Sequence, residues 1–338
     1  MAEITNKNCV KGKLGEVLKG ADVVIGLSGP NTIKKEDIKN MNSKPIVFAL
    51  ANPTPEIFPE DAFEAGAFIV ATGRSDFPNQ INNSLVFPGL FRATIDSRAP
   101  KITMEMKIVM NGAGAAGIAV SSLLIKYGYK NIIVCDTKGA IYKGRPEGMN
   151  AFKEKLAEIT NKNCVKGKLG EVLKGADVVI GLSGPNTIKK EDIKNMNPKP
   201  IVFALANPTP EIFPEDAFEA GAFIVATGRS DFPNQINNSL VFPGLFRATV
   251  DSRAPKITME MKIAAGEAIA NLVSEKELRP DYIMPSALNV STSVIVATDV
   301  AKLVMEKGFT KKKNIDIDKL RENIHSFFID NKLSGVEK

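Results

Sequence analysis

A long internal repeat limits what this chain can fold into. Residues 2–108 recur as residues 157–263 at a constant offset. The two segments differ at only two aligned pairs, Ser43 with Pro198 and Ile95 with Val250. Repeats that stack into solenoids or propellers are about 20 to 50 residues long, and packing does not require them to be this similar. The duplication is therefore recent or artificial, and the chain must fold two copies of one unit.

The composition is that of a globular protein with a sizeable core. Of the 338 residues, 44% are hydrophobic, and 44 basic against 38 acidic residues are mixed along the chain, which argues against nucleic acid as a partner. Three cysteines without a CxxC pair and a single histidine exclude a disulfide framework and a zinc site. Without an apolar signal core or an apolar run of about 18 residues, we expect a cytoplasmic protein that does not enter membranes.

The segment between the two copies carries a dinucleotide-binding signature. Residues 107–110 are apolar and predict a strand, residues 112–117 read GAGAAG, and a helical pattern follows. In such a loop Gly112 permits a tight turn, Gly114 lets the backbone approach a pyrophosphate, and Gly117 allows close helix packing. Ala115 and Ala116 would begin the helix, whose N-terminus attracts phosphate. We therefore predict a cofactor site here.

The residue that ends the next strand bears on the choice of cofactor. Asp136 closes the apolar run 131–136, about 20 residues after the glycine loop. A carboxylate there accepts hydrogen bonds from the ribose hydroxyls and repels a 2′-phosphate, which favours NAD. Lys138 weakens this inference because a cation two residues later could contact a 2′-phosphate, so NADP is the alternative.

The remaining pattern predicts an α/β fold. Apolar runs at 176–182, 200–205 and 222–226 alternate with helical patterns, which is typical of a doubly wound parallel sheet of the Rossmann type. Longer helices are expected at 257–273, 291–307 and 315–333. The last is amphipathic, and its apolar face could dock on its own domain or contact another subunit.

The first copy repeats three of these strands, at 21–27, 45–50 and 67–71, but has no glycine loop. Residues 107–136 could complete the sheet of either copy, and we expect the downstream one, which keeps the helix at 257–273 intact. The predicted domains are thus a partial duplicate at 1–106, a complete cofactor domain at 107–310 and a C-terminal amphipathic helix at 311–338. The duplicate would expose strand edges.

Three further strings resemble the cofactor domain of malic enzymes. They are FALANPTPE at 203–211, ATGRSDFPNQ at 226–235 and NNSLVFPG at 237–244. Malic enzymes oxidise L-malate with NAD(P) and a divalent metal, Mg²⁺ or Mn²⁺, and decarboxylate the product to pyruvate. The resemblance implies that Asn207 and Asn238 bind the malate carboxylates, and that Ser183, Gly184 and Asn237 lie beside the nicotinamide ribose. Without it, Asn207 would be interpreted as an ordinary turn residue.

The resemblance also shows what this chain does not match. In malic enzymes the tyrosine acid, the lysine base and the metal-binding acids precede the glycine loop, where this chain has its duplicate. The acidic pairs at 191–192 and 215–216 stand at expected helix starts, so we assign no catalytic residue and no metal ligand.

Two functions remain open from the sequence. The first is a malic enzyme by descent that binds NAD and malate, forms a homo-oligomer, and does not turn over malate as this single chain. The alternative is a non-catalytic NAD-binding module that needs a partner chain. Another Rossmann dehydrogenase is disfavoured by the Asn-Pro and Asn-Asn strings.

Overall fold

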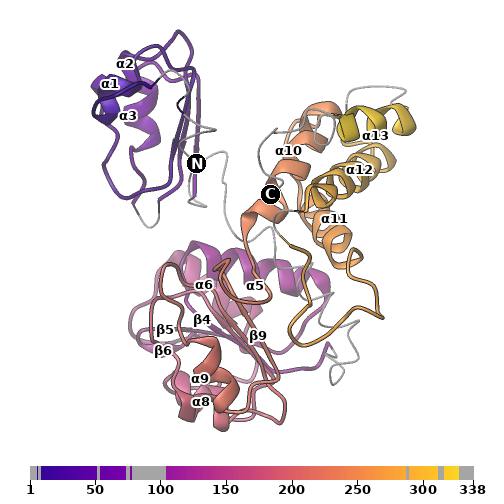
Figure 1. Cartoon of the computed structure of the whole chain (residues 1–338). Coiled ribbons are helices and arrows are strands. Elements are labelled where there is room, and N and C mark those ends of the chain that lie inside the picture. The colour runs from indigo at the N-terminus through magenta and orange to yellow at the C-terminus, as the bar shows by residue number, and fades with distance from the viewer. Residues whose placement is uncertain are drawn as a thin grey trace. The chain divides into compact units, whose positions relative to one another are not determined.

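The computed structural model describes residues 6, 9–51, 54–73, 77, 104–286, 289–310 and 316–326. These residues fall into two compact units, one that ends with Phe77 and one that begins with Met104 (Figure 1). The first unit holds most of the described residues of the first repeated segment, and the last residues of that segment, 104–108, lie in the second unit together with the whole second segment.

The second unit is built on one six-stranded sheet. Its strand order is β6-β5-β4-β7-β8-β9; β6 is antiparallel to β5, and the other neighbours are parallel. This confirms the predicted Rossmann-like fold. The elements are β4 Ile108–Asn111, α5 Ala115–Tyr127, β5 Ile132–Asp136, β6 Gly139–Ala140, α6 Ala151–Ile159, α7 Leu169–Leu173, β7 Val178–Gly181, α8 Lys190–Lys194, β8 Ile201–Ala204, α9 Pro214–Glu219, β9 Ile224–Thr227, the 3₁₀ turn η2 Asn238–Leu240, α10 Phe242–Asp251, α11 Met259–Ala270, α12 Val290–Glu306 and α13 Ile317–His325.

Helices cover both faces of this sheet, as the apolar strands require. On one face α5, α6 and the C-terminal helices bury Ile180 and Phe203 in the larger core. On the other face α7, α8 and α9 bury Val179 and Val202 in a second core. Figure 1 shows the two helical layers on opposite sides of the sheet.

The C-terminal helices confirm three sequence expectations and add one helix. α11, α12 and the described part of the last helix, α13, lie where helices were predicted. Asp316 begins α13 and accepts hydrogen bonds from the N–H groups of Asp318 and Lys319. Leu320 and Ile324 are buried against the larger core, so α13 docks on its own unit. One further helix, α10, was not predicted from the sequence; it starts with Phe242 and packs along α12.

The first unit repeats half of this architecture. Strands β1 Val23–Gly26, β2 Ile46–Ala49 and β3 Ile69–Thr72 form a parallel sheet in the order β1-β2-β3, and its helices are α1 Leu14–Val17, α2 Lys35–Lys39 and α3 Pro59–Glu64. The face that carries Val24 and Val47 is buried in a small core. The opposite face is not covered in the same way, because Ile25 is 59% exposed whereas its counterpart Ile180 is fully buried.

The cause of this difference is that the chain contains β4 and α5 once. β4 pairs with β7, so the downstream copy completes the sheet, as predicted. Among the described residues β1 pairs with β2 alone. Identical side chains thus meet different surroundings.

This predicts that the same substitution has different effects in the two copies. Ile180→Ala should destabilise its unit by about 2 to 5 kcal/mol, because it leaves a cavity in a packed core. Ile25→Ala should change stability by no more than about 0.5 kcal/mol, as exposed positions do. The measurement is urea unfolding of each full-length variant, and equal shifts in the two would contradict the burial difference.

Candidate functional site

Two of the three glycines in the loop after β4 are required by the fold itself. Gly112 has a φ of 136°, and a Cβ added there would lie 2.5 Å from the carbonyl oxygen of Leu182. A Cβ on Gly117 would lie 1.9 Å from the carbonyl oxygen of Gly112. Side chains at these two positions are therefore excluded by backbone.

Gly114 is different, because nothing in the described part of the protein requires a glycine there. Its φ is −80°, and no atom lies within 4 Å of an added Cβ. It is the N-cap of α5 and provides no side-chain cap, so the N–H groups of Ala115, Ala116 and Gly117 have no carbonyl partner within the helix. The helix N-terminus and the missing side chain leave room for a bound anion.

The loop after β7 is tied to the end of β4 by a chain of side-chain hydrogen bonds. Asn111 Nδ2 donates to Thr187 Oγ1 at 2.8 Å, and Thr187 Oγ1 donates to the Gly184 carbonyl at 3.0 Å. Ser183 Oγ lies 3.1 Å from Thr187 Oγ1 and donates to it, since the Thr187 proton is already used. Ser183 and Gly184 are thereby held next to the glycine loop.

A buried glutamate accepts a hydrogen bond from the same loop. Glu211 is fully buried and accepts hydrogen bonds from the N–H groups of Ser183 at 2.9 Å and Ala206 at 3.0 Å. Glu211 ends the segment 203–211 that resembles malic enzymes, but no role was predicted for it. A signal was present, because a charged residue stood among apolar ones directly before a predicted helix start.

Asp136 does not present a free carboxylate. Arg145 donates to its two oxygens at 2.8 and 2.6 Å, Lys153 Nζ donates at 2.6 Å, and the Lys138 N–H donates at 2.8 Å. These four donors match the roughly four acceptor positions of a carboxylate. Burial opposes ionisation, but the hydrogen bonds from Arg145 and Lys153 outweigh it and hold the pKa of Asp136 well below its usual range.

The sequence did not reveal Arg145 and Lys153 as partners of Asp136. They follow it by 9 and 17 positions, Arg145 in the connector after β6 and Lys153 in the first turn of α6, and both reach the end of β5. With two cations on one carboxylate, the local charge is no longer negative, which weakens the repulsion of a 2′-phosphate.

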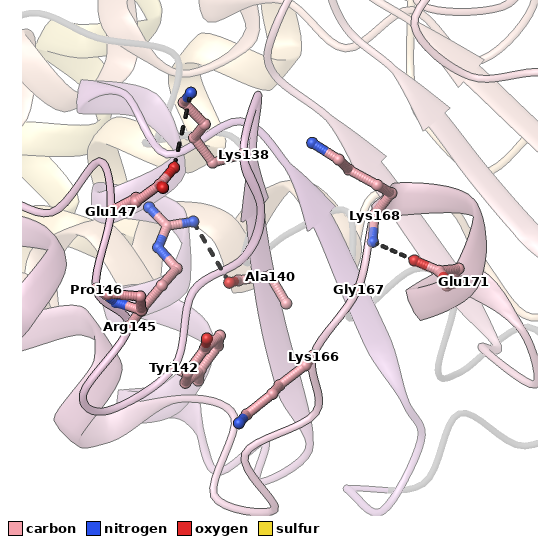
Figure 2. Close-up of a pocket in the computed structure, with 10 residues that line it drawn as sticks. All are labelled: Lys138, Ala140, Tyr142, Arg145, Pro146, Glu147, Lys166, Gly167, Lys168 and Glu171. Atoms are coloured by element: carbon pink, nitrogen blue, oxygen red, sulfur yellow. Dashed lines mark hydrogen bonds and ion pairs between the residues drawn. The ribbon is translucent and has the colours of Figure 1, made fainter.

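A cavity of about 470 Å³ lies beside this ion-pair cluster. Figure 2 shows Lys138, Arg145 and Glu147 on one side of it and Lys166, Lys168 and Glu171 on the other. Arg145 is common to the cavity wall and to the contacts of Asp136. The cationic lining suits an anionic or polar group near the end of β5.

The remaining predicted residues lie after β8 and β9. The Asn207–Pro208 peptide is cis, and a Cβ on Gly228 would lie 2.6 Å from Asn207 Nδ2. Arg229 Nη1 donates to the Pro208 carbonyl at 2.7 Å, which connects the two loops. Asn237 Oδ1 accepts the Ser239 N–H at 3.1 Å. The side chain of Asn238 lies outside the described residues.

The described residues do not fit the divalent metal that the family resemblance implies. No group of three or more His, Cys, Asp or Glu side chains comes together in that part of the chain. Of the two acidic pairs, Asp192 accepts the Lys189 N–H at 2.9 Å and Asp216 forms an ion pair with Lys190 at 2.8 Å. Both pairs stand in the first turn of a short helix, as predicted.

Among the residues that the structure describes, no helix has the length and apolar character needed to span a bilayer.

Comparisons with known proteins agree with this geometry. Residues 3–108 and 104–305 match the family described as malic enzyme, NAD binding domain. The chain is 54% identical over 211 residues to the bifunctional malic/malolactic enzyme of Bacillus subtilis, covering 62% of this chain and 52% of that one. It is 45% identical over 239 residues to the probable NADP-dependent malic enzyme of Rickettsia prowazekii, covering 66% and 31%. The chain thus spans about half the length, or less, of these relatives.

A solved structure gives the same result for the fold. The NAD-dependent malic enzyme of Thermotoga maritima matches with a TM-score of 0.64 and 38% identity, over 76% of this chain and 66% of that one.

The two kinds of glycine in the loop predict different mutational effects. Gly117→Ala should destabilise the second unit by about 3 kcal/mol or more, because its Cβ would clash with backbone that cannot move away. Gly114→Ala should cost no more than about 1 kcal/mol, the usual effect at a helix N-cap. Thermal unfolding measures both, and a severe loss of stability in Gly114→Ala would show that the fold does need this glycine.

Proposed function

Because the chain belongs to the malic enzyme family, we propose that residues 107–310 bind a nicotinamide dinucleotide as the cofactor half of a malate-oxidising, oxaloacetate-decarboxylating enzyme. The observation that carries the proposal is Gly114. Neither its backbone angles nor its neighbours call for a glycine, whereas a pyrophosphate on the N-terminus of α5 would.

The site residues would then divide the cofactor and substrate between them. Gly112, Gly114, Ala115, Ala116 and Gly117 would hold the pyrophosphate through backbone N–H groups. Ser183, Gly184 and Asn237 would contact the ribose that carries the nicotinamide. The nicotinamide ring of the bound oxidised cofactor would supply the hydride acceptor. Asn207 and Asn238 would hydrogen-bond the malate carboxylates.

NAD remains the predicted cofactor, with Asp136 at the ribose. The ion pairs of Asp136 with Arg145 and Lys153 support NADP as the alternative, because the carboxylate charge is compensated and its acceptor positions are filled. Titration with both reduced cofactors would separate the two.

Turnover would need residues other than those described. Oxidation requires a base on the malate hydroxyl, and decarboxylation requires a cation or an acid near the developing enolate. The resemblance assigns these roles to residues that precede the glycine loop, and the described residues assemble no metal site. We therefore propose binding without turnover by this chain alone. The second candidate is a cofactor-binding module completed by a partner chain, and it is favoured by the same lack of a metal site among the described residues.

The test is a fluorescence titration with NADH and NADPH, followed by an assay with L-malate, NAD⁺ and Mn²⁺. We expect saturable binding of a reduced cofactor, at least tenfold weaker binding by Gly114→Ala with its fold retained, and no turnover. The first unit has no glycine loop, so Gly29→Ala, at the position equivalent to Gly184, serves as a control. This variant should bind the reduced cofactor with the affinity of the wild-type chain.

Two results would contradict the proposal in different ways. Failure of the wild-type chain to bind either cofactor would overturn the cofactor site. Malate oxidation by the purified chain alone would leave the site intact and show that the catalytic groups are present after all.

A further inference from the structure

One buried carboxylate connects the loop proposed to face the cofactor with the loop proposed to face the substrate. Glu211 Oε1 accepts the Ser183 N–H after β7, and Glu211 Oε2 accepts the Ala206 N–H after β8. Gly184 and Asn207 each follow one of these donors directly. The two loops therefore share a single rigid side chain.

The position of Glu211 is held tightly by its surroundings. A Cβ added at Gly181 would lie 2.4 Å from Glu211 Cδ, so the strand end has no room for a side chain above the carboxylate. Among the described residues no cation forms an ion pair with Glu211 within 4 Å. Burial raises the pKa of Glu211, and hydrogen bonds from Ala206 and Ser183 oppose that shift.

A carboxylate in such a place is costly, and an apolar side chain would fill the core without that cost. What the carboxylate provides is two acceptors at a fixed separation, one for each loop. Movement of either loop would leave a buried acceptor or a backbone N–H unpaired, which is unfavourable. The two loops are thus expected to move together.

The first copy contains the same arrangement without the cofactor site. Glu56 is fully buried and accepts the N–H groups of Ser28 and Ala51, both at 2.9 Å. The two hydrogen bonds from neighbouring loops to one buried carboxylate therefore form from the repeated segment itself and do not depend on β4, α5 or a ligand. This makes Glu56 a matched control for Glu211 within one molecule.

We propose that Glu211 is a positioning residue that couples cofactor binding at Ser183 and Gly184 to malate binding at Asn207. The inference rests on the proposed function, since it assigns those loops to the two ligands. Coupling is reciprocal, so ordering of either loop by its ligand should favour binding of the other ligand. Glu211 touches neither ligand in this scheme and acts through the two backbone N–H groups.

The test measures NADH affinity by fluorescence with and without saturating L-malate, a ligand combination that cannot react. In the wild-type chain malate should tighten NADH binding by about fivefold or more. Glu211→Gln keeps the shape but turns one acceptor into a donor facing an N–H group. It should leave the affinity for NADH alone within about threefold and reduce the malate effect to less than about twofold.

Controls separate this role from a loss of fold. Glu56→Gln makes the same change in the first copy and should leave both NADH affinity and the malate effect as in the wild type. If Glu211→Gln does not fold, Glu211→Asp keeps the charge but shortens the reach by one methylene, and it should also lose the malate effect.

Each outcome has one meaning. No NADH binding by the wild-type chain would overturn the proposed function. NADH binding without a malate effect, or a malate effect that survives in Glu211→Gln or, if that variant does not fold, in Glu211→Asp, would overturn the coupling role of Glu211 and leave the cofactor site standing.

Discussion

The pairing of β4 with β7 is the interaction on which the rest of the second unit depends. β4 lies at the centre of the sheet and hydrogen-bonds to β5 on one side and β7 on the other. It places the glycine loop against Leu182 and joins Asn111 to Thr187, so the loops after β4 and β7 become one surface. Because the chain has a single β4, it can build this surface once, although it carries the downstream half twice.

The three glycines of the loop after β4 are not all explained by the packing of the second unit. Gly112 and Gly117 are glycines because backbone atoms of the protein occupy the space of a side chain. At Gly114, by contrast, none of the described residues occupies that space. Asn111 and Glu211 are buried and hydrogen-bonded to the loops after β7 and β8, while Ser183 and Asn207 in those loops are exposed. A rigid, buried support below exposed polar groups is what a binding site needs.

Much of the fold could be predicted because its signals are local. The apolar runs around Val178, Ile201 and Ile224 and the spacing of the glycine loop identify strands and a Rossmann-like sheet without reference to distant residues. α10 was not predicted because its first residues were interpreted only as part of the segment 237–244 that resembles malic enzymes, although Pro243 near the start of the helix is a recognised helix signal. The partners of Asp136 and Glu211 were not predicted, since long connectors and neighbouring strands bring them together. Burial was beyond any local pattern, as Ile25 and Ile180 have the same neighbours in sequence and opposite exposure.

The near-identity of the two copies has a practical consequence for experiments that read the protein as peptides. A fragment from residues 44–73 has the same mass as its counterpart from residues 199–228, so mass spectrometry cannot tell which copy it came from. In hydrogen exchange, however, β1 lies at a sheet edge and β7 lies inside one. The peptide that contains β1 and the identical peptide that contains β7 should therefore exchange at different rates. Measured at one mass, they should give two isotopic envelopes from one homogeneous sample, a pattern usually taken for two conformations of the same segment. Fragments that contain Ser43 or Pro198 differ in mass and would show which envelope belongs to which copy.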